Sequence, residues 1–137
     1  MANRTKVTIL EEGFRNVRVS AVGVLDTANL SAVPLLTLAQ CTNNDPMVKG
    51  ALTSFALKRV QYAVQSPLNL VVDWHATANQ LMLALIDSNE LDFQPNAYLH
   101  PADTGAAGFN GTVELATFGW AGTLTFSAVF DFLKIYK

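Results

Sequence analysis

The chain has 137 residues, of which 50% are hydrophobic and 15% charged, with a formal net charge of −2 at pH 7. This composition excludes a disordered chain, and the length predicts one domain spanning residues 1–137. The single cysteine, Cys41, excludes an internal disulfide and a cysteine-based zinc site.

The apolar content is high for one small core, which favours burial of some surface in an assembly. No apolar run approaches the roughly 18 residues that cross a membrane, so no membrane partner is expected. The first residues lack the apolar core of a secretory signal, which predicts a protein made in the cytoplasm and not secreted. Residues 1–6 are predicted to form an N-terminal arm that precedes the first strand contacts.

The first half of the chain alternates apolar and polar residues over several short stretches. Strands are predicted from the stretches 5–10, 14–25 and 52–65. Residues 30–38 are apolar around Pro34, so a strand there should be short or lie at an edge, and a helical turn is the alternative. Turn-forming residues predict a loop over 41–50.

The second half predicts two hairpins and a long loop. Ser66-Pro67 connects strand 52–65 tightly to a strand over 68–75, which reads as a hairpin. Residues 80–87 are apolar at both odd and even positions, and we favour a buried strand over a short helix. A loop of about 88–110 follows, and loops this long are usually functional or interfacial.

A closing hairpin is predicted over 111–137, with its second strand in the middle of the core. In that strand the apolar side chains fall at alternate positions, which predicts that this face is buried. These positions are Leu124, Phe126, Ala128, Phe130 and Phe132. Seven to eight strands separated by turns predict an all-β fold, an antiparallel sandwich or barrel.

Charges are distributed unevenly along the chain. Residues 60–133 contain seven carboxylates and no lysine or arginine. A surface with two signs, suited to head-to-tail contact between copies, would follow if the two halves stayed apart in space. Pairing of strands from the two halves would instead mix the charges. A dense basic patch is absent from the sequence, so nucleic acid is not an expected partner.

Candidate chemical groups are few. Asp73 and His75 share a strand face, but a nucleophile and an oxyanion hole are missing from the pattern, which favours an exposed polar pair. Asp92, His100 and Asp103 could form a metal site, although no spacing enforces it. We predict no catalytic residues, no metal and no cofactor.

Several local patterns are best explained as turns. The tripeptides 29–31 and 110–112 match the glycosylation sequon but are predicted to be turn residues. The glycines between 105 and 122 precede no helix, so they do not predict a phosphate-binding loop.

Seven residues are predicted to contact partners. Arg4 and Lys6 in the arm would reach an acidic patch on a neighbour. The apolar residues of the long loop would pack against another subunit or a shell; they are Leu91, Phe93, Tyr98 and Leu99. Trp120, between two glycines, is either a plug of the core or an exposed anchor for a partner or a sugar.

Three stretches together resemble a family of small virion structural proteins of tailed bacteriophages. They are residues 1–26, with Met1-Ala-Asn-Arg-Thr and a strand ending at Leu25-Asp26; Arg59-Val60-Gln61-Tyr62 with the run from Leu70 to Thr77; and the glycine-rich 108–122 leading into the C-terminal strand. Residues 30–50 lie outside the resemblance. The family is similar to capsid decoration, or cement, proteins with jelly-roll-like β-sandwiches.

The resemblance implies an antiparallel, jelly-roll-like β-sandwich without catalytic residues. The expected function is a capsid decoration protein on the virion surface that stabilises the assembled head. Its expected partners are the major capsid protein and copies of itself, as a homotrimer or a dimer. The alternatives are a tail or fibre component and a carbohydrate-binding module that uses Trp74 or Trp120.

Overall fold

The computed structural model describes residues 2–41 and 50–137. Most of the predicted 41–50 loop therefore lies outside the described residues. The described chain forms nine strands and one short 3-10 turn, η1. They are β1 (Arg4–Glu12), β2 (Asn16–Leu25), β3 (Val33–Leu36), η1 (Leu38–Gln40), β4 (Leu52–Val64), β5 (Asn69–Trp74), β6 (Gln80–Leu85), β7 (Asp87–Asp92), β8 (Val113–Phe118) and β9 (Leu124–Tyr136).

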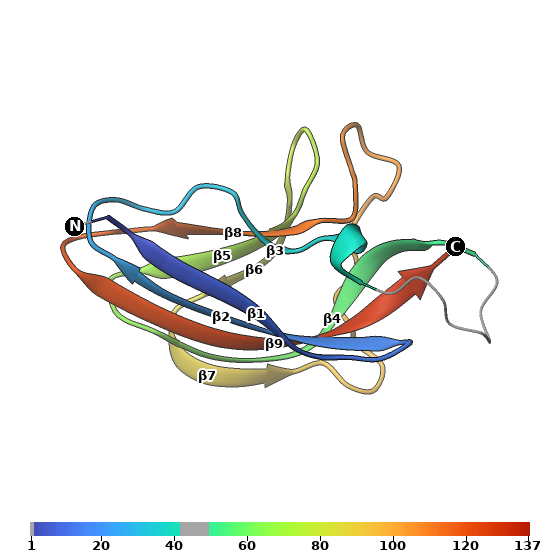
Figure 1. The fold of residues 1–137 in the computed structure, drawn as a ribbon, viewed down its shortest axis with the longest axis horizontal. Coiled ribbons are helices and arrows are strands. Elements are labelled where there is room, and N and C mark those ends of the chain that lie inside the picture. The colour runs from blue at the N-terminus through green and yellow to red at the C-terminus, as the bar shows by residue number, and fades with distance from the viewer. Residues whose placement is uncertain (1, 42–49) are drawn as a thin grey trace.

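The strands form two antiparallel sheets packed face to face (Figure 1), so the prediction of an all-β antiparallel sandwich is confirmed. One sheet has the order β1-β2-β9-β4-β7 and the other the order β3-β8-β5-β6. The predicted strand over 30–38 is β3, which is short and lies at a sheet edge as Pro34 requires. The short 3-10 turn follows it.

The pairing of the strands is nested. β2 pairs with β9, β3 with β8, β4 with β7, and β5 with β6. The first strand of this set thus lies beside the last, and the two middle strands pair at the centre of the chain. β1 adds a further strand to the outside of β2.

Both predicted hairpins are wrong. β4 lies in the five-stranded sheet and β5 in the four-stranded sheet, and the same is true of β9 and β8. Each tight connection therefore carries the chain across the core from one sheet to the other. Alternation of apolar residues does not distinguish the two cases, because strands in opposite sheets bury one face against the same core.

The predicted loop over 88–110 is also too long. Asp87–Asp92 forms β7, the edge strand beside β4, and this raises the number of strands to nine. The strand was missed because it is polar, and five of its six side chains are exposed. Its backbone hydrogen bonds to β4 hold it in place rather than side-chain burial.

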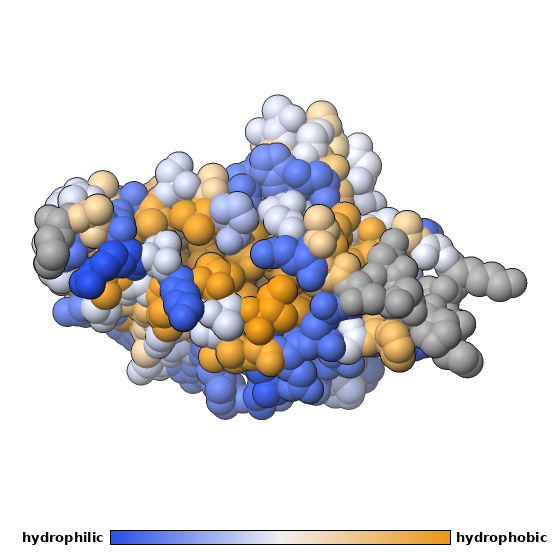
Figure 2. Space-filling model, in the orientation of Figure 1, coloured by the Kyte–Doolittle hydropathy of each residue, from blue (hydrophilic) through white to orange (hydrophobic). Residues whose placement is uncertain are grey.

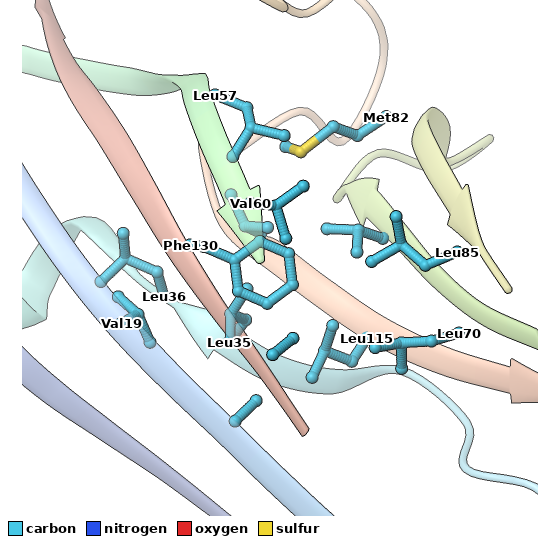
Figure 3. Close-up of a cluster of buried hydrophobic side chains, with 14 of the residues drawn as sticks. Val19, Leu35, Leu36, Leu57, Val60, Leu70, Met82, Leu85, Leu115 and Phe130 are labelled. Atoms are coloured by element: carbon cyan, nitrogen blue, oxygen red, sulfur yellow. The ribbon is translucent and has the colours of Figure 1, made fainter. Parts of the chain in front are cut away.

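The predicted buried face of the last strand is confirmed. β9 is the central strand of the five-stranded sheet, and Phe130 and Phe132 are fully buried. Figure 3 shows the Phe130 ring surrounded by aliphatic side chains of both sheets, among them Leu70 and Leu115 from the four-stranded sheet. The rings of Phe130 and Phe132 stack with centroids 5.9 Å apart. β9 therefore supplies the aromatic centre of the core.

Candidate interaction surfaces

The predicted N-terminal arm is part of the sheet. Arg4 and Lys6 lie in β1, opposite Val24 and Val22 of β2. Asn3 also ties the chain start to the turn after β2, because its side-chain oxygen accepts hydrogen bonds from the backbone N–H groups of Asp26 and Thr27 at 2.8 and 3.0 Å. The prediction of an arm that is free to reach a neighbour is therefore wrong, because β1 pairs with β2 from Arg4 onward.

A shallow cleft of about 820 Å³ lies on the outer face of the five-stranded sheet. Arg4 and Lys6 line it on the β1 side, and Asp87 and Ser88 on the β7 side. None of the described residues forms an ion pair with either cation. Lys6 is therefore available to a carboxylate of another molecule.

Further along this face the charges of the two halves mix. Asp131 accepts a hydrogen bond from Arg18 Nε at 2.6 Å, and its other carboxylate oxygen forms an ion pair with Arg59 Nε at 3.3 Å. Arg59 also contacts Glu90 on β7 at 3.2 Å. The asymmetry along the sequence is lost here because β9, from the acidic half, lies between two strands of the basic half.

One ion pair is buried. Lys134 continues the inward-facing side of β9, and its Nζ contacts a carboxylate oxygen of Glu12 at 2.7 Å and donates to the backbone carbonyl of Gly13 at 2.6 Å. The Lys134 side chain is 0% exposed. A buried cation needs such partners, so this pair fixes the end of the β1–β2 hairpin against β9.

The apolar residues of the predicted loop turn toward the protein's own core. Leu91, Phe93 and Leu99 are partly buried and pack against it, while Tyr98 is half-buried. Leu99 forms a β-bridge with Leu57 of β4. This self-packing removes much of the surface that these residues were predicted to offer to a partner.

The two tryptophans are held by hydrogen bonds to backbone carbonyls. Trp74 is 2% exposed and donates from Nε1 to the Phe55 carbonyl at 2.9 Å, so it cannot stack on a sugar. Trp120 is half-buried, packs against the core and donates from Nε1 to the Leu25 carbonyl at 3.0 Å. The geometry of Trp120 favours the core plug over the exposed anchor.

His75 does not pair with Asp73 as the shared face suggested. Its Nδ1 lies 2.8 Å from a carboxylate oxygen of Glu114, which is opposite Asp73 on β8. Burial, and to a lesser degree the Glu114 carboxylate, raises the pKa of Asp73. The three side chains form an acidic group at one end of the outer face of the four-stranded sheet.

Most of the rest of that outer face is apolar, with the polar Asn69 opposite Phe118, and sequence analysis did not single it out. Ala116, Val71 and Ala84 lie side by side across β8, β5 and β6. The exposed Phe118 and Ile86 flank this row, with exposed fractions of 57% and 56%. Leu81, at 64%, extends the face toward Asp73. We call these six residues the apolar face.

A signal for the apolar face was present in the sequence. Residues 80–87 are apolar at both odd and even positions, which fits burial on two sides. In the structure only one side of β6 is covered, by the core, and Leu81 and Ala84 point outward. The apolar residues in excess of those that the core needs therefore lie on the outer face.

The turn prediction is confirmed for 110–112 but not for 29–31. The Asn29 side chain accepts the backbone N–H of the distant Trp120 at 3.0 Å, whereas that of Asn110 accepts the N–H of Thr112, two residues ahead, at 3.0 Å. Asp92 and Asp103 likewise accept backbone N–H groups two residues ahead. Within residues 2–41 and 50–137, no cluster of three potential metal ligands occurs.

The geometry thus defines an all-β sandwich with an open sheet edge at β1 and an apolar outer face. No helix in the described part of the chain is long and apolar enough to cross a membrane. In comparisons with known proteins, no family model, no curated protein and no solved structure matches this chain.

Proposed function

We propose that this chain is a non-enzymatic structural protein of a tailed-bacteriophage virion, a decoration protein that binds the assembled head and stabilises it. The observation that carries the proposal is the apolar face on the four-stranded sheet. Three large side chains in it, Leu81, Ile86 and Phe118, are more than half exposed. Contiguous apolar surface of this kind marks a protein–protein contact.

The order of the strands supports the same proposal. Strands β2 to β9 lie four to a sheet with β2 paired to β9, which is the pairing expected of a jelly roll. Jelly rolls occur in viral capsid proteins and also in lectins, so the fold is compatible with a virion role and with a sugar-binding role. We propose that the sandwich is jelly-roll-like.

The occupant of the apolar face is proposed to be the major capsid protein. The face contains no lysine or arginine and has Asp73 and Glu114 at one end. A shell surface with apolar residues beside a basic group would complement it. Many copies on a symmetric shell then hold the head through the sum of weak contacts.

A carbohydrate-binding function is less favoured. Sugar sites use exposed aromatic platforms, and neither tryptophan offers one, because Trp74 is buried and Trp120 is held against the core. The exposed Phe118 lies among aliphatic side chains of the apolar face. The aromatic residue that lines the large cleft is Phe126, which is only 4% exposed. A tail or fibre role uses the same contact chemistry and is separated from a head role by the location of the protein on the particle.

The test measures binding to undecorated heads, prepared from a virus in which this chain is deleted. Wild-type protein should co-sediment with the heads, and Val71→Asp should lower the bound fraction at least about tenfold, because a charge then enters the apolar contact. Val129→Asp is the matched control, since Val129 is half-buried like Val71 but lies on the outer face of the other sheet.

Electron microscopy with an antibody against the chain locates the protein on intact particles. Labelling of the head supports decoration, and labelling of the tail supports the alternative. No binding to heads by the wild-type protein, or equal binding by the two variants, would contradict the proposal.

A further inference from the structure

β1 is an open edge of the five-stranded sheet. It pairs with β2 on one side, and no other strand of the described chain pairs with it on the other. With nine residues it is the longest edge strand, compared with six in β6 and β7 and four in β3. Such an edge presents unpaired backbone N–H and C=O groups to another strand.

The charge of the side chains changes sign from the start of β1 to its end. Arg4 and Lys6 lie near its start, and Glu11 and Glu12 at its end. Between them the strand is largely apolar, with Leu10 53% exposed. Figure 1 shows β1 along the near rim of the molecule, and Figure 2 shows apolar atoms gathered in the middle of this side.

We propose that β1 pairs antiparallel with β1 of a second copy, about a two-fold axis that passes beside Thr8. The two five-stranded sheets then continue into one sheet of ten strands. Thr8 faces Thr8 of the other copy, and Val7 faces Ile9. This register superposes the basic start of each strand on the acidic end of the other.

A β-bulge makes the charges meet on one face. Lys6 lies opposite Val22 and Glu11 opposite Arg18, and these two β2 positions point to the same side. In an uninterrupted strand, residues 6 and 11 would point to opposite sides. The irregularity between Ile9 and Glu11 adds one residue and brings Glu11 to the face of Lys6.

Two Lys6–Glu11 pairs therefore form in the dimer, because the two-fold axis duplicates each contact. The groups are available for this: Lys6 has no ion-pair partner within the described chain, and the Glu11 side chain is 75% exposed with Arg18 at 3.9 Å. Parallel pairing of the same strands would instead place like charges side by side. Charge complementarity thus selects the antiparallel copy as the occupant of this edge.

The inference does not depend on the proposed function, since it concerns the isolated protein in solution. Sedimentation velocity and light scattering should give a mass of about 29.6 kDa, twice the 14.8 kDa of one chain. Lys6→Glu and Glu11→Lys should each weaken the dimer by about tenfold or more, because both attractive pairs become repulsive. The double variant, Lys6→Glu with Glu11→Lys, should restore the wild-type mass.

Lys137→Glu is the matched control, because it makes the same charge change at an exposed terminal residue. Thermal melts of all variants confirm that each is folded. A wild-type monomer throughout the concentration series, or failure of the double variant to recover, overturns the proposal. The alternative partner of β1 is the other open edge of this sheet, β7, in the next copy, and Glu90→Lys on β7 tests it. If Glu90→Lys dissociates the assembly and Glu11→Lys does not rescue Lys6→Glu, β1 pairs with β7 and the two-fold pairing is wrong.

Discussion

Neighbouring residues of β9 differ in how strongly the surrounding structure restricts the size of their side chains. Phe130 lies on the central strand with its ring enclosed by side chains of both sheets (Figure 3). Val129, its neighbour, points to the outer face and is only half-buried. The same strand therefore carries one position that demands a large apolar side chain and one that does not.

We expect Phe130→Ala to lower the free energy of unfolding by about 3–5 kcal/mol, because it leaves a cavity in a closed core. Val129→Ala should cost much less. Chemical denaturation of both variants checks the prediction. A larger loss for Val129→Ala would contradict the inward direction of the Phe130 side chain.

Asp73 carries a prediction about pH. Burial first, and the Glu114 carboxylate second, raise its pKa above the usual value of 3.8. A carboxyl group with a higher pKa in the folded state binds protons more readily when the protein is folded. It therefore reduces stability as the pH rises from the pKa of the unfolded state through the pKa of the folded state. The effect is small because the group is only partly buried.

Asp73→Asn should therefore raise Tm slightly at pH 7, and the difference from wild type should vanish as pH falls below 3.8. Thermal melts between pH 3 and 7 test this, with Asp103→Asn as a control that retains the side-chain acceptor used by Gly105. A lower Tm for Asp73→Asn at pH 7 would show that the charged carboxylate stabilises the fold.

Side-chain contacts connect some strands in addition to the backbone hydrogen bonds of the sheets. Lys134 connects the end of β9 to the β1–β2 hairpin through Glu12 and Gly13. Its side chain is fully buried, whereas that of Glu12 is 22% exposed. The position is costly for a charge and depends on the partner.

Glu12→Gln should destabilise the protein by about 3 kcal/mol, because the buried Lys134 ammonium loses the carboxylate that it contacts at 2.7 Å. Lys134→Met, which removes the charge itself, should be close to neutral, since the apolar stem is kept. Urea unfolding compares the two. Equal losses would mean that the contact with Glu12, and not the burial of the Lys134 charge, determines the stability of this corner.

The whole molecule depends on contacts between the two sheets. Trp74 on β5 donates across the core to the Phe55 carbonyl of β4. The connections between β4 and β5 and between β8 and β9 also pass from one sheet to the other. Neither sheet can therefore bury its inner face without the other.

We expect one cooperative unfolding transition, with tryptophan fluorescence and far-UV circular dichroism giving the same midpoint. Trp74→Phe should lower stability by about 1–3 kcal/mol, since the Phe55 carbonyl loses its buried donor. It should leave the transition single. Two separated midpoints would show that the sheets unfold independently.

The sequence by itself determined the class of the fold and the inward face of its central strand. Alternation at Phe126, Phe130 and Phe132 depends only on the two-residue period of a strand, which holds wherever the strand is placed. The turn role of Asn110 was equally local, because its side chain accepts the backbone N–H of Thr112 two residues ahead. Such features need no knowledge of the strand partners.

Only the tertiary structure decided which strands pair and which surfaces remain open. The same alternation suits a hairpin and a crossing between sheets, so the partners of β4 and β8 were not predictable from it. Leu81 and Ala84 are apolar like core residues, and their outward direction depends on what covers β6. Arg4 and Lys6 became part of a sheet edge because β2 lies beside them, and long-range pairing of this kind leaves no periodic mark on the sequence.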